Sequence, residues 1–255
     1  MKNIKSADLK FNPFPYLVKT PAFDDDFYRK LSTDYDRFAR EKEKEKWDGR
    51  WKMDFESEEA SEILESSQSW SDLFKSIYNA RFIRECFDLF REPLKQYYPN
   101  IRPDRVLMGC KNRDIEQTFL DRLGRKIKFY DDSYYVRSDF SLARTGYKVG
   151  PHHDVETKRI AGLLYLTPDS TASTGGNLVI LEEIIKLGNK NYNRHKTEIA
   201  DSFEIVDTVN YQPNTICIFL NTKKSFHAVT PFMQGNSATR RFIYFSLCAK
   251  DKHLG

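Results

Sequence analysis

The spacing of hydrophobic residues changes once along the chain, from a helical period near the N-terminus to a strand-like period after about Ile127. In the first part, apolar side chains recur on one helix face at Phe27, Leu31, Tyr35 and Phe38. Three aspartates at 24–26 precede this stripe, and acidic side chains favour the N-terminal end of a helix dipole. We therefore expect an amphipathic helix that begins there and ends in the charged, solvated segment 40–46.

A second helical periodicity covers roughly Trp70 to Tyr98. Its apolar side chains are Leu73, Ile77, Phe82, Cys86, Leu89, Phe90 and Leu94. Pro99 and Pro103 follow, and proline cannot continue a helix. We predict one long helix here, which together with the first helix braces the outside of a sheet.

Beyond Ile127 the apolar positions fall into short runs separated by turn-forming residues. These runs are Ser133–Val136, Phe140–Ala143, Ile160–Leu166, Leu178–Leu181, Ile216–Leu220 and Phe242–Cys248. Many short strands are typical of a sandwich or a barrel, and the jelly roll is one such solution. The pattern predicts a mostly β fold with α-helical support.

The segment between Glu182 and Gln212 is longer than a strand connection requires, and it is polar and basic. Long excursions in a compact domain are often active-site lids, and ordinary surface elaboration fits the same composition. Both interpretations of the polar insertion 182–212 stay open at this point.

Composition narrows the class of protein. A chain of 255 residues with 19 Phe and 14 Tyr can bury a sizeable core. Its 41 basic and 37 acidic residues give a net charge of +4, which does not by itself indicate a nucleic-acid partner. The four cysteines form no CxxC motif, and we expect Cys217 and Cys248 to be buried reduced thiols.

The opening residues, Met1–Asp8, lack the apolar region of a signal peptide, and no apolar stretch approaches the length of a membrane span. No basic and aromatic array of the kind that binds nucleic acids occurs either. We therefore expect a cytoplasmic protein that acts on a small molecule, without a nucleic-acid or membrane partner. The sequence leaves its oligomeric state open.

Three polar residues in the strand-rich part predict a metal site. Residues i and i+2 of a strand face the same side, so His152 and Asp154 can reach one point while His153 points away. His227 is far enough along the chain to come from another strand. Two imidazoles and one carboxylate are the ligand set of mononuclear non-haem Fe(II) oxygenases. A His-x-Asp motif alone is a weak signal, so the surrounding sequence has to support it.

That surrounding sequence resembles the 2-oxoglutarate/Fe(II)-dependent dioxygenases of the prolyl-hydroxylase-like branch. The matching segments occur in the family's order, over roughly residues 134–248, at Thr145–Asp154, Lys158–Thr167, Gly175–Ile180, Asn214–Phe219, His227–Val229 and Arg240–Tyr244. The resemblance implies a double-stranded β-helix, the cupin-like jelly roll, with the N-terminal helices packed outside. It also implies a single domain over 1–255, with a mainly helical support region at 1–126 and the jelly-roll core at 127–250.

The resemblance further implies an arginine that binds the distal carboxylate of 2-oxoglutarate. Arg240 and Arg241 lie where the family places it, and Tyr165 aligns with a tyrosine that hydrogen-bonds the same carboxylate, although a plain core tyrosine is the alternative. Strand alternation puts Arg240 on one face with Tyr244 and Ser246, and Arg241 on the other face. A bound carboxylate needs polar neighbours, so we favour Arg240 as the anchor and expect Arg241 at the surface.

We therefore expect an Fe(II)- and 2-oxoglutarate-dependent dioxygenase in which His152, Asp154 and His227 are the metal ligands and catalytic residues. It would use dioxygen, with ascorbate stimulatory, and would release succinate and CO2 while hydroxylating an unactivated C–H bond of a small polar metabolite such as an amino acid. One alternative is a hydroxylase of protein side chains. Another is a non-catalytic, cupin-like metal-binding sensor or interaction module.

Overall fold

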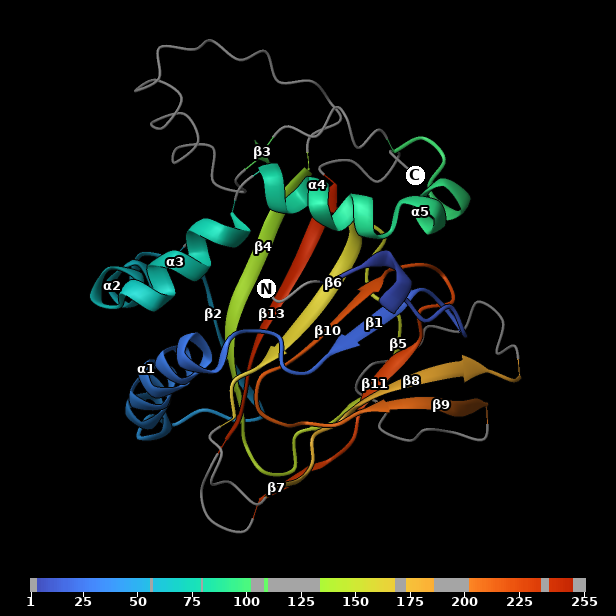
Figure 1. Ribbon diagram of the computed structural model, residues 1–255. Coiled ribbons are helices and arrows are strands. Elements are labelled where there is room, and N and C mark those ends of the chain that lie inside the picture. Colours follow the sequence, from blue (N-terminus) through green and yellow to red (C-terminus); the bar gives the residue numbers. More distant parts are fainter. Residues whose placement is uncertain are drawn as a thin grey trace, which may run out of the picture.

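The fold is a sandwich of two largely antiparallel β-sheets with helices outside the larger sheet (Figure 1). The structure is a computed structural model that describes residues 4–55, 57–78, 80–101, 108–109, 134–167, 173–185, 202–234 and 239–249. This arrangement confirms the predicted fold class, a mostly β jelly roll with α-helical support.

The larger sheet has seven strands in the order β1-β10-β6-β13-β4-β2, with β3 paired to β4. Its strands are β1 (Tyr16–Lys19), β2 (Arg50–Asp54), β3 (Met108–Gly109), β4 (Tyr134–Ala143), β6 (Lys158–Tyr165), β10 (Thr215–Leu220) and β13 (Arg240–Ala249). The smaller sheet has the order β5-β11-β8-β9, with β5 (Val149–His152), β8 (Leu178–Glu183), β9 (Phe203–Val209) and β11 (His227–Val229). A separate ribbon pairs β7 (Ser173–Gly175) with β12 (Phe232–Gln234).

The first predicted helix is confirmed, and the second is wrong as one continuous element. A short 3-10 helix, Ser6–Asp8, precedes the α-helices, which are α1 (Asp25–Glu43), α2 (Glu58–Ser66), α3 (Gln68–Ile77), α4 (Ala80–Leu89) and α5 (Arg91–Tyr97). The expected helix 70–98 is broken at Tyr78 (ψ 57°) and Phe90 (ψ 20°), whose backbones are not helical. Of the helices that the structure describes, none is long and apolar enough to cross a membrane.

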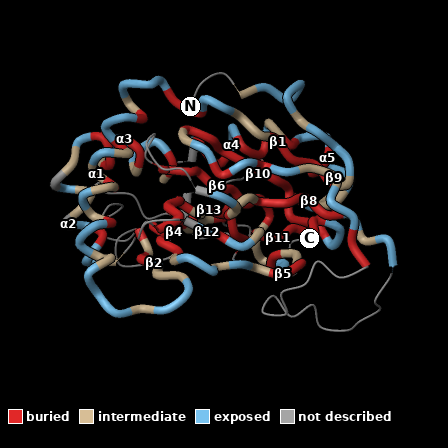
Figure 2. Tube along the Cα trace, turned by 90° about the horizontal axis from the view of Figure 1, so that it is seen from below, coloured by how far each residue is buried: buried red, intermediate tan, exposed pale blue. Residues whose placement is uncertain are grey.

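Strand alternation assigns the two faces of the larger sheet to different tasks. Ile243 and Phe245 of β13 belong to the apolar core shared with the helices, whereas Phe242 belongs to the core between the sheets. On the helix side, the Phe140 ring packs against Tyr35 of α1 at 5.7 Å and Trp70 of α3 at 4.8 Å. Figure 2 shows buried residues concentrated on the central strands. The helices therefore cover the outer face, which leaves the inner face for polar chemistry.

The N-terminal region is less purely helical than predicted. Its strand β1 pairs with β10, and its strand β2 pairs with β4 at the far edge of the larger sheet. The run Arg50–Asp54 did not stand out as a strand because it is largely charged, as edge strands tolerate. We propose that residues 1–255 form one domain, because helix α1 and strand β4 contribute to the same apolar core.

The polar insertion 182–212 also needs a correction. Its C-terminal part, Phe203–Val209, is strand β9 and pairs with β8 along the edge of the smaller sheet. The strand escaped prediction because Glu204, Asp207 and Thr208 interrupt its apolar positions, as is usual for an exposed edge. Residues 186–201 lie outside the described residues, so the question of a lid stays open.

Candidate active site

Two histidines meet across the smaller sheet. His152 is the last residue of β5, and His227 is the first residue of β11. They are direct partners in the antiparallel register, and their ring centroids lie 4.3 Å apart. Strand pairing thus brings together two residues that are distant in the sequence, as predicted for two ligands from different strands.

Asp154 lies in the loop just after β5, and its side chain is 4% exposed. It lines a cavity of about 710 Å³ together with His152, His227 and Arg240. His153 does not line that cavity but a second one beside Tyr98, which Asp154 also borders. His152 and Asp154 thus line one cavity and His153 does not, as strand alternation predicts. Asp154 nevertheless lies in a loop, because β5 ends at His152.

Hydrogen bonds fix the orientation of both imidazole rings. Nδ1 of His152 lies 2.9 Å from the carbonyl oxygen of Gly150, and Nδ1 of His227 lies 2.9 Å from that of Ser225. A carbonyl can only accept, so each Nδ1 carries the proton and donates it. In the neutral ring the lone pair is then on Nε2, the arrangement that histidine ligands of metals show when a backbone carbonyl fixes their tautomer.

The Asp154 carboxylate is held by two donors. Lys158 Nζ donates to Oδ1 at 2.7 Å, and the Tyr244 hydroxyl donates to Oδ2 at 3.1 Å. Burial opposes ionisation, but Lys158 and the two histidines together lower the pKa of Asp154 to about 2. Burial and the neighbouring Asp154 raise the pKa of Tyr244 well above its usual value, so its hydroxyl remains a donor.

Within the described ranges, no three His, Cys, Asp or Glu side chains lie in a metal-binding arrangement. The contacts of Asp154 supply a physical reason, because Lys158 and Tyr244 engage both of its carboxylate oxygens. The donors themselves suit ferrous iron, since they are two imidazoles with oriented Nε2 atoms and one ionised carboxylate. Each carboxylate oxygen has a second lone pair, so an ion bound by this set would share Asp154 with these donors or displace one of them.

Arg240 projects from β13 into the same cavity and is 1% exposed. Its Nε donates to the carbonyl oxygen of Gly176 at 2.8 Å, and its Nη2 donates to the Tyr165 hydroxyl at 3.3 Å. The guanidinium also lies 4.3 Å from the centroid of the Phe242 ring. No carboxylate pairs with Arg240 in the part of the chain that the structure describes, although a buried cation normally requires a counter-charge.

Gly176 makes room for this arginine. Its backbone has a φ of +69°, and a Cβ atom there would lie 3.1 Å from Cδ of Arg240 and 2.9 Å from the Phe232 ring. The Gly-Gly turn after β7 therefore supplies a carbonyl oxygen to the guanidinium while leaving its stem unobstructed. Tyr165, which is fully buried, contributes its hydroxyl from β6, and burial raises the pKa of that hydroxyl to about 12.

Arg241 points to the opposite face, as the alternation argument predicted, but the expectation of a surface arginine is wrong. It is 3% exposed and forms ion pairs with Asp36 and Glu43 of α1. A sequence pattern gives the face of a strand, but it does not show that a helix with two acids covers that face. Arg241 therefore joins α1 to β13 and does not line the cavity.

Sequence reasoning missed several residues that shape the site. Lys158 is one, and its i+4 spacing from Asp154 carried no signal because the two lie on a strand and a loop rather than on one helix. Tyr211 is another, with its ring 5.5 Å from the Arg240 guanidinium and its hydroxyl accepting from the backbone N–H of Arg241. Tyr244 was detectable, since it shares a strand face with Arg240.

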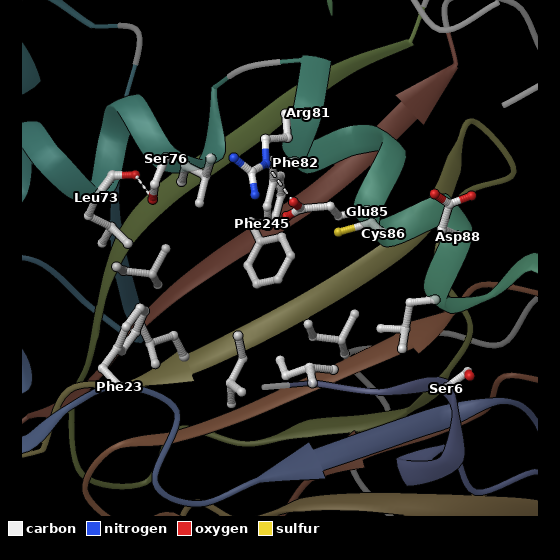
Figure 3. Close-up of a pocket in the computed structure, with 17 residues that line it drawn as sticks. Ser6, Phe23, Leu73, Ser76, Arg81, Phe82, Glu85, Cys86, Asp88 and Phe245 are labelled. Carbon is white, nitrogen blue, oxygen red and sulfur yellow. Dashed lines mark hydrogen bonds and ion pairs between the residues drawn. The ribbon is translucent and has the colours of Figure 1, made fainter. Parts of the chain in front are cut away.

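A further cavity of about 670 Å³ lies between helices α3 and α4 and the outer face of the larger sheet (Figure 3). Its lining is mostly apolar, and Figure 3 shows Arg81 and Glu85 paired with each other at its edge, at 2.7 Å. Burial raises the pKa of the Cys86 thiol far above its usual value, so that thiol is unreactive. This cavity lacks the reactive groups found between the sheets.

Several solved structures are similar to this chain at low sequence identity. A prolyl-4-hydroxylase from Pseudomonas putida aligns at 14% identity with a TM-score of 0.47, over 96% of this chain and 97% of its own. A Trichoplax adhaerens prolyl hydroxylase, in complex with a hypoxia inducible factor peptide fragment, aligns at 12% identity with a TM-score of 0.47, covering 97% and 90%. IDO from Bacillus thuringiensis aligns at 15% identity with a TM-score of 0.41, covering 98% and 99%. A search of curated proteins found no match.

The family comparison is more specific. Residues 139–246 match the family model of the 2OG-Fe(II) oxygenase superfamily. This range contains His152, Asp154, His227, Arg240 and Tyr165, every candidate site residue predicted from the sequence. The part of the chain that carries the candidate site is therefore similar to the 2OG-Fe(II) oxygenase superfamily, a family that uses Fe(II), 2-oxoglutarate and dioxygen.

Proposed function

We propose that this enzyme hydroxylates an unactivated C–H bond of a small polar metabolite that carries an anionic group, such as an amino acid. His152, Asp154 and His227 would hold Fe(II), and Arg240 with Tyr165 would bind the distal carboxylate of 2-oxoglutarate. The bound iron supplies the oxidising chemistry, in which oxidative decarboxylation of 2-oxoglutarate releases succinate and CO2. The protein positions the reactants and limits the access of water.

The observation that carries the proposal is the environment of Arg240. A guanidinium that is 1% exposed, without an acidic partner among the described residues, lines the same cavity as the two histidines and Asp154. Its planar fork matches a carboxylate bidentately, and the Tyr165 hydroxyl lies beside it. A dicarboxylate that bound iron at one end would supply the missing counter-charge at the other end.

The charges around the cavity support an anionic substrate. Lys52, Arg137 and Lys148 line it, and none of the three has an acidic partner in the described part of the chain. The two acids that line it are already engaged, each in an ion pair with a neighbouring basic side chain, at 2.6 Å and 2.7 Å. The net positive lining favours a carboxylate or another anion on the substrate. A volume of about 710 Å³ is in the usual range for small-molecule sites.

The proposal is tested by measuring succinate production from 2-oxoglutarate in the presence of Fe(II), ascorbate and oxygen. Slow uncoupled turnover is expected without substrate, and a panel of amino acids and other small anions should contain compounds that stimulate it. Mass spectrometry of the stimulating compound should show a gain of one oxygen atom, which separates hydroxylation from desaturation and ring closure. Arg240→Gln serves as the variant in which this stimulation is lost.

Two other functions remain as outcomes of the same assay. Stimulation by peptides but by no small metabolite would favour a hydroxylase of protein side chains. The absence of succinate, together with no 2-oxoglutarate-dependent absorption band in the anaerobic Fe(II) protein, would favour a non-catalytic metal-binding module.

A further inference from the structure

Three arginines are almost completely buried in the described part of the chain, and they differ in their partners. Arg241 pairs with two acids of α1, and Arg240 lines the cavity of the candidate active site. The third is Arg159, 1% exposed, which has neither an acidic partner among the described residues nor a role in that cavity. A buried guanidinium without a counter-charge is costly, so its surroundings bear on what it could bind.

A β-bulge turns Arg159 away from the candidate active site. Along the pairing of β6 with β13, Leu247 is opposite Ile160 and Cys248 is opposite Lys158, so Arg159 is the extra residue. Bulges of this kind redirect side chains and occur beside active sites. Here Lys158 reaches the Asp154 carboxylate, whereas Arg159 lines the other cavity, which lies at the C-terminal end of α5.

The contacts of Arg159 leave much of its hydrogen-bonding capacity unused. Nη1 donates to the carbonyl oxygen of Glu156, and the guanidinium lies over the face of Tyr98, 4.6 Å from the ring centroid. Nε and Nη2 are buried without a hydrogen-bond partner. The Glu156 side chain is exposed and forms no ion pair with Arg159 in the described structure. Two donor nitrogens on one planar edge are the geometry that binds an oxyanion bidentately.

The cavity beside Arg159 has a volume of about 400 Å³, and its lining carries charges of both signs, with two lysines as well as the carboxylates of Asp154 and Glu156. Lys223 and Lys224 line it, both are exposed, and neither pairs with an acid among the residues described. Asn221 fixes its floor, since Nδ2 donates to the carbonyl oxygens of Val155 at 3.0 Å and Lys158 at 2.9 Å. The loop that carries Asp154 is therefore held between the two cavities.

We propose that Arg159, with Lys223 and Lys224, forms a second anion-binding site that takes a phosphate-sized oxyanion behind the loop carrying Asp154. The guanidinium would bind two oxygens of the anion, and the two lysines would attract it from solvent. The volume leaves room for more than a bare phosphate, so the anion could be free or could be the phosphate group of a metabolite. This inference is independent of the identity of the hydroxylated substrate.

The test is titration calorimetry of the full-length protein, without metal or 2-oxoglutarate, using inorganic phosphate at low ionic strength. Saturable binding is expected, and Arg159→Gln should weaken it at least about thirtyfold, because a charge-assisted bidentate contact is lost. Arg240→Gln should bind phosphate normally, which separates this site from the 2-oxoglutarate pocket. Arg29→Gln on exposed α1 is the matched control for the loss of one positive charge.

Two further binding measurements complete the test. Glycerol 3-phosphate should bind as tightly as inorganic phosphate if the site takes a monoester, and much more weakly if it takes only the free anion. The Lys223→Ala/Lys224→Ala double variant, at exposed positions, should weaken binding several-fold and decides the question if Arg159→Gln does not fold. Absence of saturable phosphate binding to the wild type would overturn the proposal. Binding by Arg159→Gln and by the double lysine variant that equals binding by the wild type would also overturn it.

Discussion

At the scale of single residues, the site depends on two adjacent arginines that strand alternation sends in opposite directions. Arg240→Ala should raise KM for 2-oxoglutarate by roughly thirtyfold to several thousandfold, since losing one partner of a buried charge-assisted pair costs on the order of 2–5 kcal/mol. Arg241→Ala should change KM by less than about threefold, because its side chain lies outside the cavity. Steady-state kinetics of both variants test this. A large rise in KM for Arg241→Ala with a small one for Arg240→Ala would show that the two arginines were assigned to the wrong faces of the strand.

The Arg240→Ala and Arg241→Ala variants should also differ in their free energy of unfolding. Arg241→Ala removes the partner of Asp36 and Glu43, whose side chains are 27% and 21% exposed. We expect a loss on the order of 1–3 kcal/mol, below the range for fully buried pairs because water reaches both acids. Thermal unfolding measures it, and Arg240→Ala should cost less, because no acid is left unpaired by that change.

Lys158 gives a third prediction at this scale. Its ammonium group neutralises the carboxylate that would bind iron, 2.7 Å from Oδ1 of Asp154. Lys158→Met should therefore tighten Co(II) or Fe(II) binding by about tenfold, the effect of removing a nearby like charge worth on the order of 1–2 kcal/mol. Anaerobic metal titration measures the change. Weaker binding in the variant would mean that Lys158 orients the carboxylate rather than competing for it.

At the scale of elements, the turn that follows β7 positions the anchor on β13. Gly176→Ala should displace Arg240, because the new methyl group would lie 3.1 Å from Cδ of that arginine. We expect KM for 2-oxoglutarate to rise about tenfold, together with a stability loss of about 1 kcal/mol from the left-handed backbone. Gly49→Ala is the control, since its φ is +64° with no atom within 4 Å of the added Cβ. Equal kinetic effects in both variants would contradict the positioning role.

The packing of α1 on β13 predicts a pH effect. Burial raises the pKa of Asp36, but hydrogen bonds from Arg241 and Arg40 outweigh it and hold that pKa below its usual 3.8. A depressed folded pKa stabilises the protein above the unfolded value, and the gain is lost as pH falls through the folded value. Urea denaturation measures the free energy of unfolding of wild type and of Asp36→Asn. The difference between the two should therefore shrink below about pH 4. A gap that stays constant with pH would contradict this pairing.

Much of this arrangement of elements could be predicted from the sequence. Periodicity located α1 and the strands carrying Arg240 and Tyr165, and the i, i+2 rule separated His152 from His153. Local patterns could not show that β2 and β9 are strands, since their edge positions leave charged residues exposed. They also could not reveal the bulge at Arg159 or the partners of the arginine next to Arg240, which depend on the register of distant strands.

At the scale of the whole molecule, the fold separates structural and chemical tasks between the two faces of one sheet. The helix side of the larger sheet is mostly apolar. Its inner side contributes Arg240 to one cavity, and the facing smaller sheet contributes His152 and His227. Strands hold such groups more rigidly than loops do. Only Asp154 lies on a loop, and hydrogen bonds from Asn221 and Lys158 restrain that loop from both sides.

The central claim is that this cavity binds one ferrous ion through His152, Asp154 and His227. Anaerobic equilibrium dialysis against Fe(II) should give about one ion per wild-type chain and a near-complete loss in His152→Ala and in His227→Ala. His153→Ala, one residue from a proposed ligand but facing the other cavity, should keep its iron. Full retention of iron in both ligand variants, or its loss in His153→Ala alone, would contradict the account.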